Sequence, residues 1–408
     1  MQAAIIGGGI GGLAAALYLA RADIRCTVFE AGASFSELGV GINLQPHAIR
    51  ALAELGLYDA LAKVSVEPRE TCFFNRHGQL IHKERLGRNA GYQWPQFSIH
   101  RADLHDALLS AVRARLGADA VVMAHRCVRV DEAPGGVRLH WEGPRGEPLP
   151  ASEATIAIAC DGVHSTVRRQ FYPGEGPFAF GGINMWRGST RYRPILGGRC
   201  TILAGSLSFG KLVIYPMRDH GDGTQLINWN VEVKSDAAGP NQWNKNGRIE
   251  DFLWRYDKSR FDWLDVPDLL SRADMVLEYP MVDRDPIPRW SFGRVALLGD
   301  AAHPMYPRSG NGAAQSIIDG ECLARMLTTH EPEAALAAYQ AERLPKANGI
   351  VLASRSSPPD LIIETVEART GGAPFERLED VIGADEMAAI IDRFKRLVGG
   401  DLASVNRA

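Results

Sequence analysis

A glycine-rich turn between an apolar run and an Ala/Leu-rich segment constrains the fold of this chain more than any other feature. Residues 2–6 are apolar, Gly7-Gly8-Gly9-Ile10-Gly11-Gly12 follows them, and residues 12–21 are rich in alanine and leucine. Residues 25–29 are typical of a second strand, which ends in Glu30. Strand, glycine turn, helix and second strand within about 30 residues are typical of a βαβ unit. We therefore expect an α/β fold built on a parallel sheet.

The glycine spacing is that of a dinucleotide-binding fingerprint. Gly7 permits the tight turn, Gly9 lets the backbone approach a pyrophosphate, and Gly12 allows close contact between helix and strand. We expect Gly11 to belong to the same binding turn. The first amides of the helix can then bind phosphate. Glu30 is placed to accept from ribose hydroxyls, and its charge disfavours the 2′-phosphate of NADP in this cleft. A glycine turn without a ligand is the structural alternative, and this motif alone leaves NAD and FAD open.

A late motif favours FAD. An apolar run at residues 295–298 leads into Gly299-Asp300-Ala301-Ala302-His303-Pro304. A carboxylate at Asp300 can hydrogen-bond a ribityl hydroxyl, which NAD lacks. A helix that begins near Asn311 can direct its positive end toward a reduced flavin ring. The cofactor-binding residues expected here are Asp300, Gly310, Asn311 and Gly312.

Three further polar residues have a functional and a structural interpretation. Asp161, in Asp161-Gly162 after the apolar run 154–160, either contacts the cofactor or caps the helix that follows. Arg101 opens the predicted helix 101–116, where the helix dipole opposes a cation, so we expect a cofactor phosphate or ribityl group nearby. His303 is either a catalytic acid–base or a residue that shapes its loop by hydrogen bonding.

The composition limits the classes of partner. The 408 residues carry a formal net charge of −3, which gives no general attraction to nucleic acid or to a membrane surface. The first apolar run begins at Gln2, so we expect no leader, and no apolar run is long enough for a membrane-spanning helix. The six cysteines are scattered without metal-ligand spacing. We expect free thiols, a cytoplasmic location and no metal site.

A change to β-type runs with several tryptophans after residue 178 predicts a second, sheet-based domain inserted into the first. The expected organisation is a first part of the FAD-binding domain at 1–70, a substrate-domain hairpin at 71–98, a second FAD-binding part at 99–175, the substrate domain at 176–285, a third FAD-binding part at 286–350 and a helical tail at 351–408.

With these motifs in order, the chain resembles the single-component (group A) flavin-dependent aromatic hydroxylases from about residue 3 to residue 347. Within that family it is similar to the phenazine hydroxylase branch. That likeness rests on residues 39–46 (Gly-Val-Gly-Ile-Asn-Leu-Gln-Pro), 98–101 (Ser-Ile-His-Arg), 185–188 (Met-Trp-Arg-Gly) and 279–286 (Tyr-Pro-Met-Val-Asp-Arg-Asp-Pro). Two positions depart from the usual family pattern: Ala159-Cys160 replaces Gly-Ala, and Asn311 replaces the Gln of many members.

The resemblance implies a Rossmann-like FAD-binding domain of the p-hydroxybenzoate hydroxylase type, non-covalent FAD, and reduction by NADH or NADPH. It also implies capture of O2 at flavin C4a as a hydroperoxide that hydroxylates a small aromatic or N-heteroaromatic substrate, carboxylated or phenolic, in a monomer or homodimer. Gly41 joins the cofactor-binding residues. The implied substrate-pocket residues are Leu44, Trp186, Tyr215, Met217, Tyr306 and Pro307. The implied catalytic residues are Arg187, His303 and Pro304.

Two alternatives remain at this stage. A flavin-dependent halogenase shares this fold, but the sequence has no Trp-x-Trp-x-Ile-Pro stretch. A flavin-binding redox protein without turnover is the other, and the complete loop from Asp300 to Gly312 counts against it.

Overall fold

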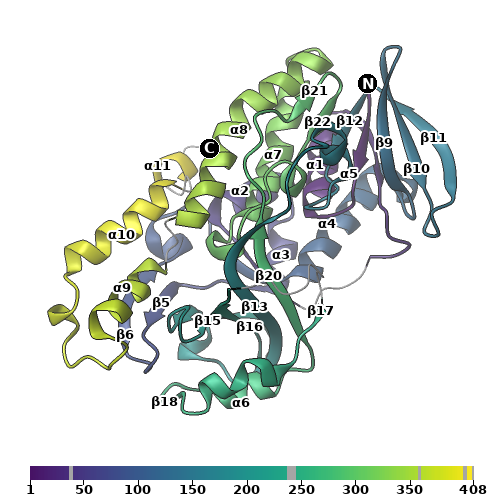
Figure 1. Cartoon of the computed structure of the whole chain (residues 1–408). Coiled ribbons are helices and arrows are strands. Elements are labelled where there is room, and N and C mark those ends of the chain that lie inside the picture. Colours follow the sequence, from purple (N-terminus) through teal and green to yellow (C-terminus); the bar gives the residue numbers. More distant parts are fainter. Residues whose placement is uncertain (36–39, 237–244, 357–359, 398–401, 407–408) are drawn as a thin grey trace.

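Two β-sheets of different kinds organise the chain. The computed structural model describes residues 1–35, 40–236, 245–356, 360–397 and 402–406 (Figure 1). Gly39, part of one stretch that carries the family resemblance, lies outside these residues. The N-terminus lies next to the first sheet, and the C-terminal helices lie beside the second sheet.

The first sheet is built around β1 and is parallel except at one edge. In spatial order its strands are β21 (Ser291–Phe292), β22 (Val295–Leu297), β12 (Ile156–Ala159), β1 (Gln2–Ile6), β2 (Arg25–Phe29) and β8 (Val121–Val122). Only β21 runs antiparallel to its neighbour. The helix α1 (Ile10–Arg21) packs against this sheet, and α4 (Arg101–Leu116) and α7 (Gly312–Leu327) pack against α1. The predicted βαβ unit is therefore present, with β1 and β2 paired in parallel.

The turn between β1 and α1 requires glycine at two positions. Gly7 has φ +104°, a left-handed conformation that disfavours other residues. A Cβ on Gly12 would overlap the carbonyl oxygen of Gly7. These two glycines let the helix begin directly above the end of the strand.

Several elements differ in extent from the sequence prediction. The expected strand at 121–130 is divided into β8 and β9 (Arg126–Ala133), because Ala124 takes a positive φ of 60° between them. The strand β9 instead forms a three-stranded meander with β10 (Gly136–Glu142) and β11 (Pro148–Ala154). The helix expected at 332–344 continues through Pro345 as α8 (Pro332–Ser356), whose later turns bury Ala347, Ile350 and Val351.

The second sheet is mostly antiparallel and has eight strands. In spatial order they are β17 (Lys245–Asn246), β20 (Val276–Asp283), β13 (Ala179–Tyr192), β16 (Gln225–Lys234), β15 (Lys211–Asp219), β14 (Cys200–Ala204), β5 (Glu70–Phe74) and β6 (Leu80–Arg85). The predicted hairpin of residues 71–98 thus joins the sheet through β5, which pairs in parallel with β14. The exact domain boundaries stay a prediction.

The two faces of the second sheet have different neighbours. One face buries a hydrophobic core that includes Trp229 and Phe252 and packs on α6 (Val266–Ser271). On the other face, Phe73 and Leu203 pack against the C-terminal helices α9 (Leu361–Thr370) and α10 (Ala384–Leu397). Figure 1 shows these helices, in yellow-green and yellow, beside β5 and β6.

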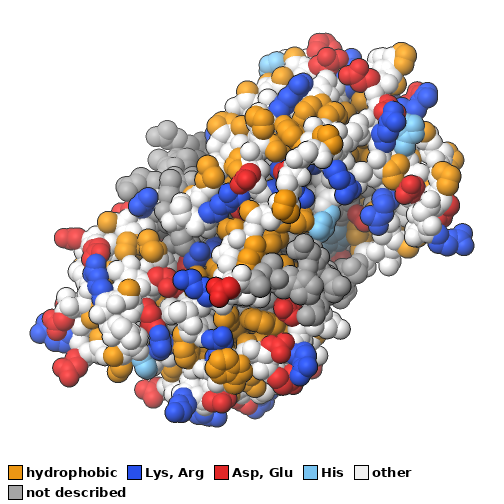
Figure 2. Space-filling view, in the orientation of Figure 1, with side chains coloured by type: hydrophobic (Ala, Val, Ile, Leu, Met, Phe, Trp, Pro, Cys, Tyr) orange, Lys and Arg blue, Asp and Glu red, His pale blue; other side chains and the backbone are white. Residues whose placement is uncertain are grey.

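Smaller elements connect the two sheets and complete the surface. Apart from short 3-10 helices, the remaining elements are α2 (Pro46–Glu54), α3 (Tyr58–Val64), α5 (Thr166–Phe171), α11 (Leu402–Asn406), the short sheet β3 (Gly41–Leu44), β7 (Phe97–His100) and β4 (Ser65–Val66), and the hairpin β18 (Arg260–Phe261) with β19 (Leu264–Asp265). Among the helices described, none combines the length and apolarity needed to span a bilayer. In the face shown in Figure 2, acidic and basic side chains are interspersed.

A buried ionic network ties α7 to α8 and to the loop after β22. Asp319 on α7 accepts a hydrogen bond from Nε of Arg343 (2.7 Å) with one oxygen. Its other oxygen accepts from Nε2 of His303 (2.6 Å) and from the amide of Gly299 (3.1 Å). Asp319 is fully buried. Burial alone would raise the pKa of its carboxyl group, but His303 and Arg343 lower it to about 2.

We predict that Asp319→Asn lowers the free energy of unfolding at pH 7 by about 3–5 kcal/mol, because it leaves Arg343 buried without its charge partner. Urea denaturation of the FAD-loaded protein measures this change. The depressed pKa means that the ionised Asp319 stabilises the fold above about pH 4 and loses that effect as the pH falls toward about 2, so the difference from wild type should narrow in acid. The exposed pair Arg138–Glu153 supplies the control, since Glu153→Gln should cost less than about 1 kcal/mol. Equal costs in the two variants would contradict the prediction.

Candidate functional site

A cavity of about 540 Å³ lies where the carboxyl ends of the parallel strands meet the second sheet. Ligands of open α/β sheets bind outside the carboxyl ends of the strands, at this kind of position. The lining residues come from the glycine turn, the segment around β3, the loop between β22 and α7, the inner face of the second sheet, and the C-terminal helices. Segments far apart in the sequence therefore meet around one space.

The glycine turn forms one end of this cavity. Gly9 and Gly11 line it, and a Cβ on Gly9 would meet nothing within 4 Å. Glu30 does not line the cavity. Its two carboxylate oxygens accept hydrogen bonds from the backbone amides of Gly8 and Gly32, each at 2.8 Å. The carboxylate thus fixes the glycine turn to the end of β2, and its contact with a ribose stays a prediction.

The loop before α7 forms the middle of the cavity. Asp300, Gly310, Asn311 and Gly312 all line it, as predicted for one side of a bound ligand. Gly310 has φ +62°, which lets the chain turn into the helix. The side chain of Asp300 is exposed to the cavity, and the first residues of α7, Gly312 and Ala313, face the same space. The positive end of a 16-residue helix is therefore directed at the ligand position.

Two arginines face the cavity without a carboxylate partner. Among the described residues, no carboxylate oxygen lies within 4.0 Å of the guanidinium of Arg101 or Arg187, whereas many other arginines of the chain are paired. Arg187 donates to the carbonyl of Gly41 (2.8 Å) and to Oδ1 of Asn230 (3.1 Å), both neutral groups. Burial lowers the pKa of Arg101; Arg187 adds to this effect and Asp300 opposes it. Arg101 is exposed to the cavity and Arg187 is half-buried, so two positive charges without an ion-pair partner face this space and favour anionic groups.

Asp161 has the structural role that the sequence left open. Its carboxylate accepts from the hydroxyl of Ser165 (2.6 Å) and from the amide of Thr166 (2.8 Å) at the start of α5. It does not line the cavity, although its neighbours Cys160 and Gly162 do. The carboxylate is therefore used to cap the helix, and burial raises its pKa.

The structure places His303 and Pro304 behind the cavity wall. His303 is buried, bonded to Asp319 and 5.2 Å from the ring centroid of Trp290. Neither residue lines the cavity, whereas Met305, Tyr306 and Pro307 do. This placement gives His303 no contact through which to exchange a proton with a ligand, and supports the loop-shaping alternative.

Three of the six predicted substrate-pocket residues line the cavity and three do not. Tyr215, Tyr306 and Pro307 line it. Trp186 points to the opposite face of the sheet from Arg187, because neighbouring residues of a strand alternate, and it packs against Phe252.

Leu44 and Met217 are displaced from the cavity by local packing. Leu44 is fully buried in the core of the first sheet. Met217 is fully buried, two residues after Tyr215 on the same strand. Its sulfur lies beneath Gly41, 2.6 Å from where a Cβ on that glycine would be.

Sequence reasoning missed most of the inner face of the second sheet. Phe73, Leu203 and Val213 form an apolar floor, and Lys211 and Glu232 lie beside it. The alternation of residues 211, 213 and 215 along β15 is the signal that could have found part of this face. The remaining floor residues come from β5 and β14, and their alignment depends on a pairing that no local pattern reveals.

His47 is a further cavity residue that the sequence did not suggest. It follows Pro46 at the start of α2 and lines the cavity. Burial, together with the charges of Arg343 and Arg50, lowers its pKa to about 4. His47 is therefore neutral near pH 7.

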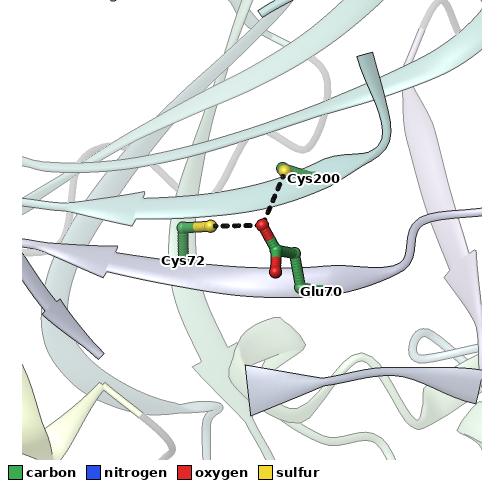
Figure 3. A group of neighbouring side chains, drawn as sticks. All are labelled: Glu70, Cys72 and Cys200. Atoms are coloured by element: carbon green, nitrogen blue, oxygen red, sulfur yellow. Dashed lines mark hydrogen bonds between the residues drawn. The ribbon is translucent and has the colours of Figure 1, made fainter. Parts of the chain in front are cut away.

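One group of potential metal ligands lies outside the cavity. Figure 3 shows Glu70 and Cys72 on one strand and Cys200 on its neighbour, with both thiols 3.5 Å from the same oxygen of Glu70. Their ligand atoms lie within 4.8 Å of one another, although the sequence separates Cys200 from the others by more than 120 residues. Glu70 already accepts from Lys83 at 3.1 Å. The hydrogen bonds within the cluster and this ion pair account for the arrangement.

Comparisons with known proteins agree with this geometry. A family model described as an FAD binding domain matches residues 1–354. The chain is 42% identical over 359 residues to phenazine 1,6-dicarboxylic acid hydroxylase PhzS of Lysobacter antibioticus, covering 86% of this chain and 88% of that protein. It is 30% identical over 360 residues to 6-hydroxynicotinate 3-monooxygenase of Pseudomonas fluorescens, covering 85% and 88%. The chain belongs to the family of FAD-dependent aromatic hydroxylases.

Solved structures show the same fold. A salicylate hydroxylase in complex with substrate superimposes with a TM-score of 0.75 and 25% identity, covering all of this chain and 97% of that one. HpxO of Klebsiella pneumoniae, complexed with FAD and uric acid, has a TM-score of 0.75 at 22% identity, covering 99% and 96%. The predicted Rossmann-like FAD-binding fold of the p-hydroxybenzoate hydroxylase type is thereby confirmed.

These findings establish the reaction class. This aromatic hydroxylase is an FAD-dependent monooxygenase that uses NAD(P)H and O2 to hydroxylate an aromatic or heteroaromatic small molecule. The predicted family, including its phenazine hydroxylase branch, and the predicted cofactors are confirmed. The comparisons give no support to the halogenase alternative, and named hydroxylases as relatives favour an enzyme over a redox protein without turnover.

We predict that Asp300→Ala weakens FAD binding by about 10- to 150-fold, because one charge-assisted hydrogen bond contributes about 1.5–3 kcal/mol. Fluorescence titration of the apo-protein with FAD measures the dissociation constant. Glu153→Ala is the matched control, because it removes an exposed carboxylate that does not line the cavity. This control should leave the dissociation constant of FAD unchanged. Wild-type affinity in Asp300→Ala would remove this carboxylate from the cofactor site.

Proposed function

We propose that this hydroxylase acts on a carboxylated, fused-ring N-heteroaromatic compound of the phenazine type. The observation that carries the proposal is an apolar floor next to a cation without an ion-pair partner. The 42% identity to a phenazine dicarboxylic acid hydroxylase supports the same substrate class.

We assign FAD to the end of the cavity that holds the glycine turn and the loop before α7. Gly9 leaves space for the pyrophosphate and Gly11 lines the same end, Asp300 faces the position of a ribityl chain, and the N-terminus of α7 faces the position of the ring. Arg101 opens α4 on the same side of the cavity, and an anionic phosphate would compensate its charge. The residues present therefore fit FAD.

We assign the substrate to the inner face of the second sheet. Phe73, Leu203 and Val213 offer apolar contacts to a flat ring system. Arg187 stands between this floor and Gly41, and a guanidinium binds a carboxylate through two parallel hydrogen bonds. Tyr215 lies beside Arg187, and burial raises the pKa of its hydroxyl group, so it stays protonated and can donate.

The chain's own residues then bind, orient and shield the reactants. Bound FAD supplies the chemistry: it takes two electrons from NAD(P)H and delivers one atom of O2 to the ring, while the other leaves as water. Arg187 fixes the acid group of the substrate, and therefore which ring carbon faces the cofactor. The apolar floor excludes water, which protects the coupling of NAD(P)H oxidation to hydroxylation.

We further propose that the enzyme works in the cytoplasm as a monomer or homodimer, with no nucleic-acid or membrane partner. All six cysteines of the chain are free thiols, and free thiols suit a reducing compartment. A net charge of −3 gives no general attraction to polyanions. Light scattering during size-exclusion chromatography measures the number of subunits.

The substrate proposal predicts that phenazine-1-carboxylate stimulates NAD(P)H oxidation and gains one oxygen atom, as read by product mass. Salicylate and 6-hydroxynicotinate, each with a single ring, should stimulate oxidation less, because they cover less of the apolar floor. Preference for either single-ring acid would contradict the assigned substrate class.

For Arg187→Gln we predict that the dissociation constant of phenazine-1-carboxylate rises about 10- to 150-fold, since a charged hydrogen-bond partner is lost. Perturbation of the flavin absorbance spectrum reports binding. Phenazine without the carboxyl group is the control. Its affinity should fall less than about threefold in Arg187→Gln, because it makes no ionic contact with Arg187. Equal losses for both compounds would assign Arg187 to holding Gly41 rather than the substrate.

A further inference from the structure

The C-terminal helices α9, α10 and α11 lie beyond the matched family region, which ends at residue 354. They nevertheless reach the cavity. Ile391 on α10 and Val405 on α11 line it directly. In Figure 1, α9 lies beside β5 and β6 at the edge of the second sheet, and α10 and α11 lie between it and α8. The tail therefore contributes side chains to the space assigned to the substrate.

An apolar cluster joins the tail to the cavity floor. Phe73 and Leu203 line the cavity and at the same time pack with buried residues of the tail. The tail residues of this cluster are Ile362, Ile363, Val366, Ile382 and Ile391. The sheet face that carries the substrate floor is thus shared between the cavity and the tail.

The last helix is also fixed to the cavity rim. Asn406 accepts a hydrogen bond from the amide of Gln93 (2.9 Å) and donates to the carbonyl of Gly91 (3.0 Å). These two residues flank Tyr92, which lines the cavity. The end of the chain therefore positions both Val405 and the loop opposite it.

Asp360, directly before α9, connects the tail to two cavity-lining cations. One of its carboxylate oxygens accepts from Nζ of Lys211 (2.7 Å) and from Arg308 (2.8 Å). Lys211 also pairs with Glu232 at 2.7 Å. Lys211, Glu232 and Asp360 are all at most 4% exposed, so these charges are held away from water.

The charges of this network cancel, with two cations and two carboxylates. Both cations lower the pKa of Asp360, to about 2, against the effect of burial. Removal of one partner from such a network is costly, because the others remain buried and charged. Asp360 therefore fixes the tail to β15 through Lys211 and to the loop before α7 through Arg308.

We propose that the C-terminal segment, residues 360–397 and 402–406, is the distal wall of the substrate cavity and sets the number of fused rings that the cavity accepts. Ile391 and Val405 are its specificity-determining residues, and Asp360 is the positioning residue that holds the wall. The inference rests on the proposed function, because it takes the sheet floor as the position of the aromatic rings.

The test uses Val405→Trp in the FAD-loaded enzyme, with Leu402→Trp as the matched control. Leu402 lies on the same helix but is exposed and does not line the cavity. The probes are benzoate, quinoline-2-carboxylate and phenazine-1-carboxylate, with one, two and three rings, and binding is read from the flavin absorbance. Val405→Trp should weaken binding of the three-ring acid about tenfold or more and that of benzoate less than about twofold, since added bulk shortens the cavity.

The outcomes separate this inference from the proposed function. If the wild-type enzyme binds no acid of the series more tightly than benzoate, the proposed substrate class fails. If the wild type prefers phenazine-1-carboxylate and Val405→Trp binds all three acids as the wild type does, the wall is elsewhere and the inference is overturned. Ile391→Trp repeats the measurement from α10, and covers the case in which Val405→Trp loses its fold as judged by FAD content.

The positioning role of Asp360 has its own test, in the coupling of the reaction. Loss of the wall admits water, so NAD(P)H, a proton and O2 yield NAD(P)⁺ and hydrogen peroxide instead of hydroxylated product. Asp360→Asn should lower the ratio of product to NAD(P)H consumed at least twofold while FAD stays bound, and Asp360→Glu should restore part of that ratio. An unchanged ratio in Asp360→Asn would remove Asp360 from this role.

Discussion

The site depends on two backbone hydrogen bonds that hold Gly41 against the second sheet. Its amide donates to Oδ1 of Asn228 at 2.7 Å, and its carbonyl accepts from Arg187 at 2.8 Å. A side chain could not fit there, because Tyr215 and Met217 both lie 2.6 Å from the position of a Cβ. The segment that follows the glycine turn is therefore held directly against the sheet that forms the floor. Without this contact, the two halves of the cavity would not share a wall.

Local sequence patterns were sufficient to locate the backbone segments that line one end of the cavity. Glycines at positions 7, 9 and 12 have fixed spacing, since together they must satisfy the geometry of a single turn. The run from Gly299 to Gly312 is likewise one continuous stretch of sequence, between β22 and α7. A pattern of that kind can be recognised without knowledge of the rest of the fold. The same holds for α4, whose predicted bounds, residues 101–116, are those observed.

The substrate side could not be predicted in the same way, because its residues are brought together by strand pairing. Trp186 and Arg187 were both expected in the pocket, yet adjacent residues of a strand face opposite sides. Phe73 comes from a hairpin that pairs with β14, more than 120 residues later in the chain. The tail gave no signal, since Ile391 and Val405 are ordinary apolar residues of two helices. Only their position against the sheet gives them a role.

Charge pairing explains why the two ends of the cavity differ in what they bind. Where the tail meets β15 and the loop before α7, Lys211 and Arg308 are compensated by Glu232 and Asp360, so a ligand there gains nothing from carrying a charge. At the end near Gly41, Arg101 and Arg187 have no carboxylate within ion-pair distance among the described residues. Under the proposed function, Arg101 and Arg187 therefore stabilise anionic groups of cofactor and substrate near Gly41, and the tail end selects for size. A flat aromatic acid bound with its carboxylate toward Arg187 and its far ring toward the tail satisfies both conditions.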